Sequence, residues 1–247
     1  LLPQPAQVFS GAQRRDEMGR DVATGDIDGD GETDLVIGVY LEDAGAADRG
    51  AVHIHRGLEG GLFDPQPSVI LTGARASDWF GRSVALCDFN ADGRMDLAAA
   101  AHRWEDFERD PRVNDHGAIF VFLGHPDGFL DEPDVIAQGV VPLEGGGFEA
   151  RAAMLLGWDL DAGDVDGDGA CDLVATSREY PATDRRNDGA VFVFRGLARD
   201  ANRAGGVTTT PSRIWAAEPA EPRSEMGRRV VVGDVNGDGA AEVLVSQ

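Results

Sequence analysis

The feature that most constrains this chain is an acidic segment of nine residues that occurs four times. The copies are DIDGDGETD from Asp26, DFNADGRMD from Asp88, DVDGDGACD from Asp164 and DVNGDGAAE from Asp234. Their first aspartates are 62, 76 and 70 residues apart, a spacing that is too long for a helical solenoid repeat and suits one small sheet per repeat. The sequence therefore predicts a tandem array of similar structural units.

The residues around each acidic segment predict β-strands. An apolar residue followed by glycine precedes every copy, at Met18-Gly19, Phe80-Gly81, Leu156-Gly157 and Met226-Gly227. Short strand-forming runs lie on both sides of the acidic segment, for example DLVIGVY or DLVATS on the far side. A third run, closed by glycine, recurs as GAVHIHRG from Gly50, GAIFVFLG from Gly117 and GAVFVFRG from Gly189.

A fourth run completes each repeat, as PSVILTG, PDVIAQG or PSRIWAA. Four short strands joined by Gly- and Asp-rich turns, with no segment of helical period, are typical of the blades of a β-propeller. We therefore predict an all-β fold, a β-propeller formed by four-stranded blades.

Together these residues resemble the FG-GAP repeats of the integrin α-subunit propeller and its bacterial relatives. Phe80-Gly81 supplies the FG, the GVY of Gly38 to Tyr40 stands near the GAP position, and the D-x-[DN]-x-D-G-x-x-[DE] loop separates the first and second strands. The resemblance covers nearly the whole chain. It implies a propeller with a calcium loop between the first and second strands of each blade.

The order of the strands predicts one propeller or propeller fragment over residues 1–247. Three whole blades fall at about residues 19–79, 80–155 and 156–225. Residues 1–18, with AQVFSG as a fourth-type strand, and residues 226–247 share a further, partial blade. Either the ends meet in a four-bladed ring or the chain is a fragment of a larger ring. We favour the fragment, because a chain that stops at the last residue of a strand leaves a bare sheet edge.

Oxygen ligands without histidine or thiolate favour a hard cation, and a flexible ring of several oxygens suits Ca²⁺ better than Mg²⁺. The predicted ligands are the side chains at positions one, three, five and nine of each segment and the backbone carbonyl at position seven. In chain order they are Asp26, Asp28, Asp30, Glu32 and Asp34; Asp88, Asn90, Asp92, Arg94 and Asp96; Asp164, Asp166, Asp168, Ala170 and Asp172; Asp234, Asn236, Asp238, Ala240 and Glu242. The sequence thus predicts about four Ca²⁺ ions.

Two other interpretations of the acidic segments are weaker. An EF-hand loop begins in the same way but needs Glu at its twelfth position, where this chain has Ile37, Ala99, Ala175 and Val245. An acidic turn without an ion is possible for one copy, since Asp, Asn and Gly are ordinary turn formers. Four copies with one oxygen spacing favour calcium, in a structural role. The first and third loops carry more carboxylates, so we expect them to bind more tightly.

Composition limits the partners. The chain has 22 basic and 44 acidic residues, a net charge of −22. This balance disfavours nucleic acid and anionic membranes as partners, because phosphate binding needs positive charge. No apolar run is long enough to insert directly into a bilayer. Cys87 and Cys171 occupy non-equivalent places in different repeats, so we expect free buried thiols that leave the compartment open.

The family topology implies that the calcium loops occupy one face and that a protein or carbohydrate ligand binds the opposite face. Two connections predicted there are rich in aromatic and basic residues, namely Arg103, Trp104, Phe107, Arg109 and Arg112 in the first and Tyr180, Arg185 and Arg186 in the second. Trp and Arg are common at binding hot spots. The alternative is a loop folded over its own blade, with its arginines paired to local acids.

His53 and His55 stand where the other blades have phenylalanine, and Trp79 and Trp158 adjoin the FG position, so we expect all four to pack. The favoured function is a calcium-stabilised binding or adhesion module, extracellular or at the cell surface, with a periplasmic location also open. A structural repeat of a surface layer or fibre is the alternative. An enzyme is less favoured, since the sequence shows no nucleophile elbow, phosphate loop or zinc signature.

Overall fold

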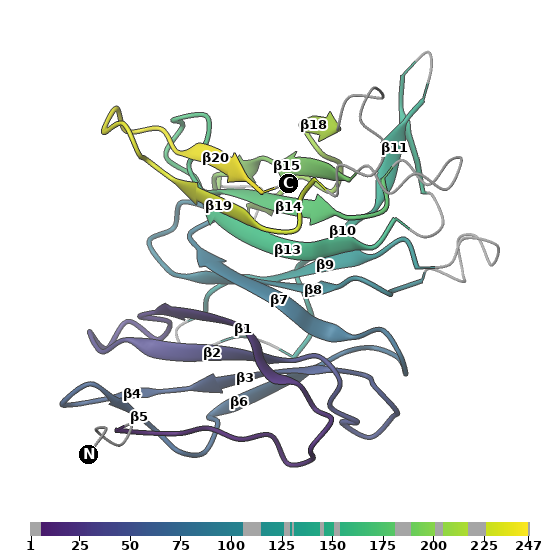
Figure 1. Cartoon of the computed structure of the whole chain (residues 1–247). Coiled ribbons are helices and arrows are strands. Elements are labelled where there is room, and N and C mark those ends of the chain that lie inside the picture. Colours follow the sequence, from purple (N-terminus) through teal and green to yellow (C-terminus); the bar gives the residue numbers. More distant parts are fainter. Residues whose placement is uncertain are drawn as a thin grey trace.

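The computed structural model describes residues 6–105, 115–125, 129, 131–143, 146–150, 154–180, 189–200, 205–216 and 226–246. In this part of the chain all regular secondary structure is β, which confirms the all-β prediction. No helix here is long and apolar enough to cross a membrane. Figure 1 shows the sheets stacked in chain order, from β1–β6 at the bottom to β19 and β20 at the top.

Three antiparallel sheets contain four strands each, and a fourth contains two. The first sheet consists of β1 (Met18–Gly25), β2 (Asp34–Val39), β3 (Ala51–His55) and β6 (Val69–Thr72). The second consists of β7 (Phe80–Cys87), β8 (Asp96–Ala101), β9 (Ala118–Phe122) and β10 (Val135–Gln138). The third consists of β13 (Leu156–Gly163), β14 (Asp172–Ser177), β15 (Ala190–Phe194) and β18 (Arg213–Ala216), and the fourth of β19 (Val230–Gly233) and β20 (Glu242–Val245).

Three small hairpins extend from these sheets: β4 (Gly57–Leu58) with β5 (Leu62–Phe63), β11 (Val140–Pro142) with β12 (Phe148–Ala150), and β16 (Gly196–Leu197) with β17 (Gly206–Val207). The predicted strand at residues 6–11 is wrong. This segment forms no strand, and it lies instead along the first sheet. Gln7 exchanges two hydrogen bonds with the Phe63 backbone, at 2.7 and 2.9 Å, and the Phe9 ring lies 4.6 Å from the His55 ring.

An apolar layer lies between each pair of neighbouring sheets. Phe80 and Phe120 pack between the first and second sheets, Phe89 and Phe192 between the second and third, and Val191 and Val230 between the third and fourth. The predicted packing of β15 is confirmed, because all five of its residues are buried. The stacked sheets and their order are consistent with a propeller-like fold.

The FG glycine has a packing role in this arrangement. Gly81 has a φ of +79°, and a Cβ at this position would come within 2.2 Å of the Ala51 carbonyl oxygen. Gly50, at the start of the third strand of the preceding sheet, would in turn place a Cβ 2.1 Å from the Phe80 carbonyl oxygen. Both glycines therefore permit a close backbone contact between consecutive sheets.

The first strands of the four sheets are joined by side-chain hydrogen bonds. Asp21 on β1 accepts from the Val84 N–H on β7 (3.0 Å) and from the Ser83 hydroxyl. The Leu160 N–H on β13 donates to the Ser83 hydroxyl oxygen (3.0 Å), and the Val230 N–H on β19 donates to Asp159 (2.8 Å). Strands β1, β7, β13 and β19 therefore lie side by side along one line through the molecule.

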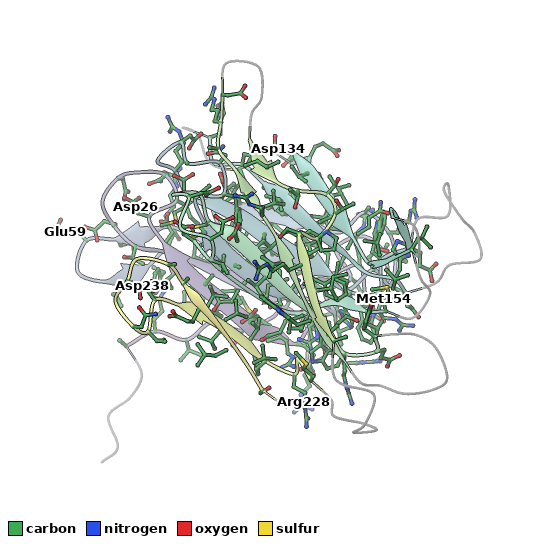
Figure 2. All side chains as sticks on the ribbon, turned by 90° about the horizontal axis from the view of Figure 1, so that it is seen from above. Asp26, Glu59, Asp134, Met154, Arg228 and Asp238 are labelled. Carbon is green, nitrogen blue, oxygen red and sulfur yellow. A yellow bond between two sulfur atoms is a disulfide. The ribbon has the colours of Figure 1, made fainter. Side chains whose placement is uncertain are left out.

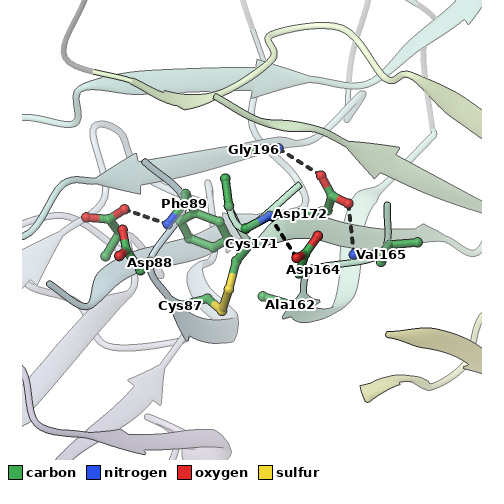
Figure 3. Close-up of a disulfide and its surroundings, with 12 residues drawn as sticks. Cys87, Asp88, Phe89, Ala162, Asp164, Val165, Cys171, Asp172 and Gly196 are labelled. Carbon is green, nitrogen blue, oxygen red and sulfur yellow. Dashed lines mark hydrogen bonds between the residues drawn. A yellow bond between two sulfur atoms is a disulfide. The ribbon is translucent and has the colours of Figure 1, made fainter. Parts of the chain in front are cut away.

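The two cysteines form a disulfide, so the prediction of free thiols is wrong. Cys87 ends β7 and Cys171 immediately precedes β14, and their Cα atoms are 6.0 Å apart (Figure 3). The Cys171 N–H also donates to the Asp88 carbonyl oxygen at 3.0 Å. The prediction failed because it compared positions within the repeat, whereas stacked sheets bring different positions of neighbouring repeats together.

Candidate calcium loops

The four acidic segments form the turns between the first and second strands of the four sheets, on the left-hand side of Figure 1. The first aspartate of each turn accepts hydrogen bonds from the backbone of its own loop. In the first loop Asp26 accepts from the N–H groups of Gly29 (2.8 Å), Asp30 (3.1 Å) and Gly31 (3.0 Å). Asp164 and Asp234 repeat this pattern, and Asp88 repeats two of its bonds.

In the first three loops the last carboxylate joins the loop to the sheet. Asp96 accepts from the Phe89 N–H (2.8 Å) and from the Gly124 N–H after β9 (2.7 Å). Asp34 and Asp172 make the same pair of bonds in the first and third sheets. All three carboxylates are buried. Burial raises the pKa of Asp96 to about 7 and also raises the pKa of Asp172, which favours their neutral forms. A cation bound beside them would counteract this effect and favour the charged carboxylates.

Two loops bring three carboxylates close together. Ligand oxygens of Asp26, Asp28 and Asp34 lie within 4.8 Å of one another, and so do those of Asp164, Asp166 and Asp172. Ca²⁺ binds oxygens at about 2.3–2.6 Å, so two ligands of one ion are at most about 5 Å apart. The geometry and the all-oxygen donor set of these two loops therefore fit a hard divalent cation.

The remaining predicted ligands are arranged differently. Asp30, Asp92, Asp168 and Asp238, at position five, each accept from the N–H at position seven, at 2.8, 3.1, 3.0 and 2.9 Å. These bonds fix the backbone of Glu32, Arg94, Ala170 and Ala240. Asn90 and Asn236 donate to Asp92 (3.3 Å) and Asp238 (3.1 Å). Asn236 also donates to Glu242, the last ligand of the fourth loop.

The loop backbone needs left-handed residues at positions four and six. Gly31, at position six of the first loop, has a φ of +90°, as expected from its role in the turn. At position four the second loop has Ala91, with a φ of +53°, where the other loops have glycine. An alanine in this region costs about 1 kcal/mol relative to glycine.

The sequence analysis missed the arginines that pair with the predicted ligands. Arg195 lies 2.6 Å from Asp166 and 2.9 Å from Asp168, and Arg56 lies 3.3 Å from Asp28. Both arginines stand before the glycine that closes the third strand, in HRG and FRG, so the repeat itself contained the signal. Arg199, 3.6 Å from Asp92, pairs with a ligand of the second loop from outside this repeat position. A guanidinium at this place offsets the repulsion between carboxylates and competes with a metal ion for them.

The described part of the opposite face supports packing for Trp104. This side chain is only 7% exposed, its ring lies 5.2 Å from the His116 ring, and it lines a cavity of about 710 Å³ between the first and second sheets. Arg103 pairs with Asp115 at 3.1 Å, as the alternative interpretation expected. Phe107, Arg109, Arg112, Arg185 and Arg186 lie outside the described residues.

The other four residues expected to pack are in ring contacts. His55 is buried and His53 lies 2.7 Å from Glu42. Trp79 and Trp158 are only partly buried, and the guanidinium groups of Arg103 and Arg82 lie over them, 4.7 and 4.4 Å from the ring centroids.

Comparison with known families identifies the class of protein. A family model for the FG-GAP repeat matches residues 18–55 and 80–121, and a model for an FG-GAP-like repeat matches residues 164–245. These matches cover more than half of the chain, which therefore belongs to the FG-GAP repeat family, as the resemblance predicted.

Curated relatives include integrin α subunits and a phospholipase. The chain is 30% identical to mouse integrin alpha-IIb over 178 residues and 30% identical to chicken (Gallus gallus) integrin alpha-V over 210 residues. These alignments cover 69% and 83% of the chain but 16% and 18% of the relatives. Mouse phosphatidylinositol-glycan-specific phospholipase D is 31% identical over 215 residues, which are 85% of the chain and 24% of the relative. The chain thus spans less than a quarter of each relative.

Two solved structures share the fold at low sequence identity. The exotype rhamnogalacturonan lyase YesX aligns with a TM-score of 0.51 and 17% identity, over 92% of the chain and 38% of the lyase. Bacillus licheniformis rhamnogalacturonan lyase PL11 aligns with a TM-score of 0.52 and 14% identity, over 92% of the chain and 39% of the lyase. At this identity the likeness concerns the fold alone.

Proposed function

We propose that this chain is a calcium-binding β-propeller module that binds a ligand outside the cell or at its surface. The observation that carries the proposal is that the first loop and the third loop each bring the oxygens of three carboxylates close together. The four loops share one backbone pattern, so we assign one Ca²⁺ to each, held by the twenty residues named in the sequence analysis. The family matches and the integrin α relatives support an adhesion-type module.

In this proposal the sheets are consecutive blades of one domain over residues 1–247. Residues 19–79, 80–155 and 156–225 form whole blades, and β19 and β20 begin the strands of another. The hydrogen bonds from Asp21 and Asp159 to the next first strand, and the glycine contacts of the FG motif, hold the blades in sequence.

The proposed role of calcium is structural. Each ion joins position one, at the end of the first strand, to position nine. In the first three loops position nine is hydrogen-bonded both to the loop and to the glycine that follows the third strand. Without the ion the carboxylates repel one another, and binding to the folded state alone adds stability. Chelation should therefore lower the melting temperature more at low salt than at high salt, where screening relieves part of the repulsion.

The disulfide supports the proposed location. Disulfides persist in oxidising compartments and are rare in the cytosol. Cys87–Cys171 therefore favours an extracellular, cell-surface or periplasmic site, where free calcium is also high. The proposed ligand, a protein or a carbohydrate, binds the face opposite the calcium loops.

Binding remains our proposal over catalysis and over assembly in a fibre. The phospholipase D relatives and the lyases with a similar fold make an enzyme the contrasting case. A screen for phosphodiesterase and polysaccharide lyase activity on the purified chain tests it. Turnover that persists whichever cluster of residues is mutated would point to a contaminant. Sedimentation with and without calcium separates a monomeric module from an assembling repeat.

Calorimetric titration with Ca²⁺ tests the proposal directly. We expect about four sites, and Asp164→Asn should remove one of them with little effect on the first loop, because the loops lie in separate sheets. Glu59→Gln is the matched control, because it removes one exposed acid from the β4–β5 turn outside the loops. Absence of a binding signal at millimolar calcium, or equal losses in both variants, would contradict the proposal.

A further inference from the structure

An arginine-rich cluster lies at the ends of the first strands that are remote from the calcium loops. The residue after the FG-type glycine is Arg20, Arg82, Trp158 or Arg228 in the four sheets. Because β1, β7, β13 and β19 are neighbours in this order, these positions follow one another at the same end of the strands, and the Arg82 guanidinium lies beside the Trp158 ring. Figure 2 shows Arg228 at the end of the last hairpin that is remote from Asp238, which marks the fourth acidic loop.

Arg82 is the centre of this cluster. Its side chain is buried, and its guanidinium lies 4.4 Å from the Trp158 ring centroid and 5.6 Å from that of Tyr40. Neither Arg82 nor Arg20 forms an ion pair with any carboxylate of the described residues. Such a charge is costly to bury without an anion, although stacking on aromatic rings offsets part of the cost.

Positive charge accumulates here in a chain that is otherwise strongly acidic. Burial, followed by the nearby charge of Arg20, lowers the pKa of Arg82 to about 10, so that it stays cationic at neutral pH. Arg229 also lies near, but it is paired with Asp159 at 3.1 Å. Arg20 and Arg82, at the same position of neighbouring repeats, form no ion pair among the described residues, and neither does Arg178, whose guanidinium lies 5.0 Å from the Trp158 ring centroid. The Asp159 carboxylate is near enough to Arg82 to offset part of the positive charge.

The aromatic side chains around Arg82 form a continuous row. Tyr40 contacts Trp79 at 5.6 Å, Trp79 contacts His102 at 5.3 Å, and His102 contacts Trp158 at 5.7 Å between ring centroids. Burial, with Arg82 and Arg103, lowers the pKa of His102 to about 3, so this imidazole is neutral and adds no charge. Tyr40, Trp79 and Trp158 are all partly exposed and offer apolar surface beside the guanidinium.

We propose that Arg20 and Arg82 bind a carboxylate group of the ligand, with Tyr40 and Trp158 in contact with the apolar part that bears it. A guanidinium held over a ring keeps its N–H edge free for a planar, bidentate carboxylate. A single carboxylate fits better than a long polyanion, because the chain as a whole has a net charge of −22. An acidic amino acid and a uronic acid both supply this group. The inference rests on the proposed ligand-binding face and specifies which chemical group of the ligand binds there.

Two small probes test the site in saturating calcium and low salt. N-acetyl-L-glutamate and D-glucuronate are titrated while the arginine side-chain NMR signals and tryptophan fluorescence are recorded, with N-acetyl-L-glutamine amide as the neutral analogue. Two charge-assisted hydrogen bonds correspond to a Kd on the order of 1 mM. Binding of either acid without binding of the amide supports the site, and the acid that binds identifies the source of the carboxylate.

Variants locate the binding. Arg82→Gln should weaken it about tenfold or more, and Arg82→Lys should recover only part of the loss because lysine lacks the bidentate fork. Arg20→Gln changes a less buried residue and provides the same test if Arg82→Gln fails to fold. Arg213→Gln, which changes an exposed arginine of β18, is the matched control and should bind the probe normally. Unchanged binding in both Arg82→Gln and Arg20→Gln would overturn the site.

A calcium titration of the same samples separates this inference from the proposed function. Protein that binds calcium in its loops but neither acid at about 50 mM, roughly fifty times the expected Kd, overturns the carboxylate site and leaves the calcium module intact. Protein that binds an acid but no calcium supports the site and overturns the calcium assignment.

Discussion

Removal of the Cys87–Cys171 disulfide is expected to destabilise the protein strongly. The bridge joins the second and third sheets beside two of the proposed calcium loops, and its cysteines are 84 residues apart in the chain. A cross-link of this span reduces the entropy of the unfolded chain by an amount worth about 4–5 kcal/mol at 25 °C. Measured effects are commonly smaller, so we expect a loss of about 2–4 kcal/mol in the double variant Cys87→Ser/Cys171→Ser.

The assay is urea unfolding at fixed calcium concentration, followed by circular dichroism and by tryptophan fluorescence. The wild type, the double variant and the wild type after reduction are compared, and the reduced wild type should unfold at nearly the same urea concentration as the variant. Equal midpoints for the wild type and the double variant would refute the reasoning, because they would mean that the unfolded chain carries no cross-link.

The same variant tests how the disulfide affects the loops. Cys87 immediately precedes Asp88, and Cys171 immediately precedes Asp172. Loss of the bridge should therefore weaken calcium binding in the second and third loops and leave the first loop unchanged. An equal loss in all loops would show that the bridge acts through global stability rather than through the position of its neighbours.

Three further changes have distinct expected results. Arg195→Gln should raise the calcium affinity of the third loop several-fold in calorimetry, since Arg195 competes for Asp166; an unchanged or lower affinity contradicts this. Ala91→Gly should raise stability by roughly 0.5–1 kcal/mol in urea unfolding by relieving the positive φ, and a destabilised variant would be the contrary result. Burial raises the pKa of Asp78 to about 6, so the folded state binds more protons than the unfolded state between about pH 4 and 6, and stability falls as pH rises through this range. Asp78→Asn should make the melting temperature less dependent on pH between about pH 4 and 6. An unchanged slope of melting temperature against pH would contradict this.

The repeat made most of the fold predictable. Each sheet is short, its strands are local in sequence, and the turn chemistry recurs in phase, so the strands around Asp26–Asp34 and its three equivalents could be located from residues alone. The fourth-type strand at residues 6–11 was predicted from composition, but Gln7 bonds to Phe63 of the β4–β5 hairpin and Phe9 packs against His55 of the first sheet. A strand-like composition does not specify which sheet edge, if any, a segment joins.

Most of the features that were not predicted from the sequence depend on contacts between sheets. The Cys87–Cys171 bridge and the Asp21 and Asp159 hydrogen bonds join residues 62 to 84 positions apart, and no local pattern pairs them. The Arg195 ion pairs lie within one sheet and could have been predicted from the register of FRG against the acidic loop. Residue type left two interpretations of Trp104 open, a binding residue or a loop folded over its own blade, because its burial depends on neighbours that only the fold brings together.

The most direct test of the central claim is an anomalous difference map from a crystal grown in calcium. The account predicts one calcium peak inside each acidic loop, about 2.3–2.6 Å from the side-chain oxygens at positions one, three, five and nine. It also predicts that Arg56 and Arg195 lie farther from Asp28 and Asp166 than 3.3 and 2.6 Å when the loops hold calcium. Loops without anomalous peaks at millimolar calcium, with these arginine pairs intact, would contradict it.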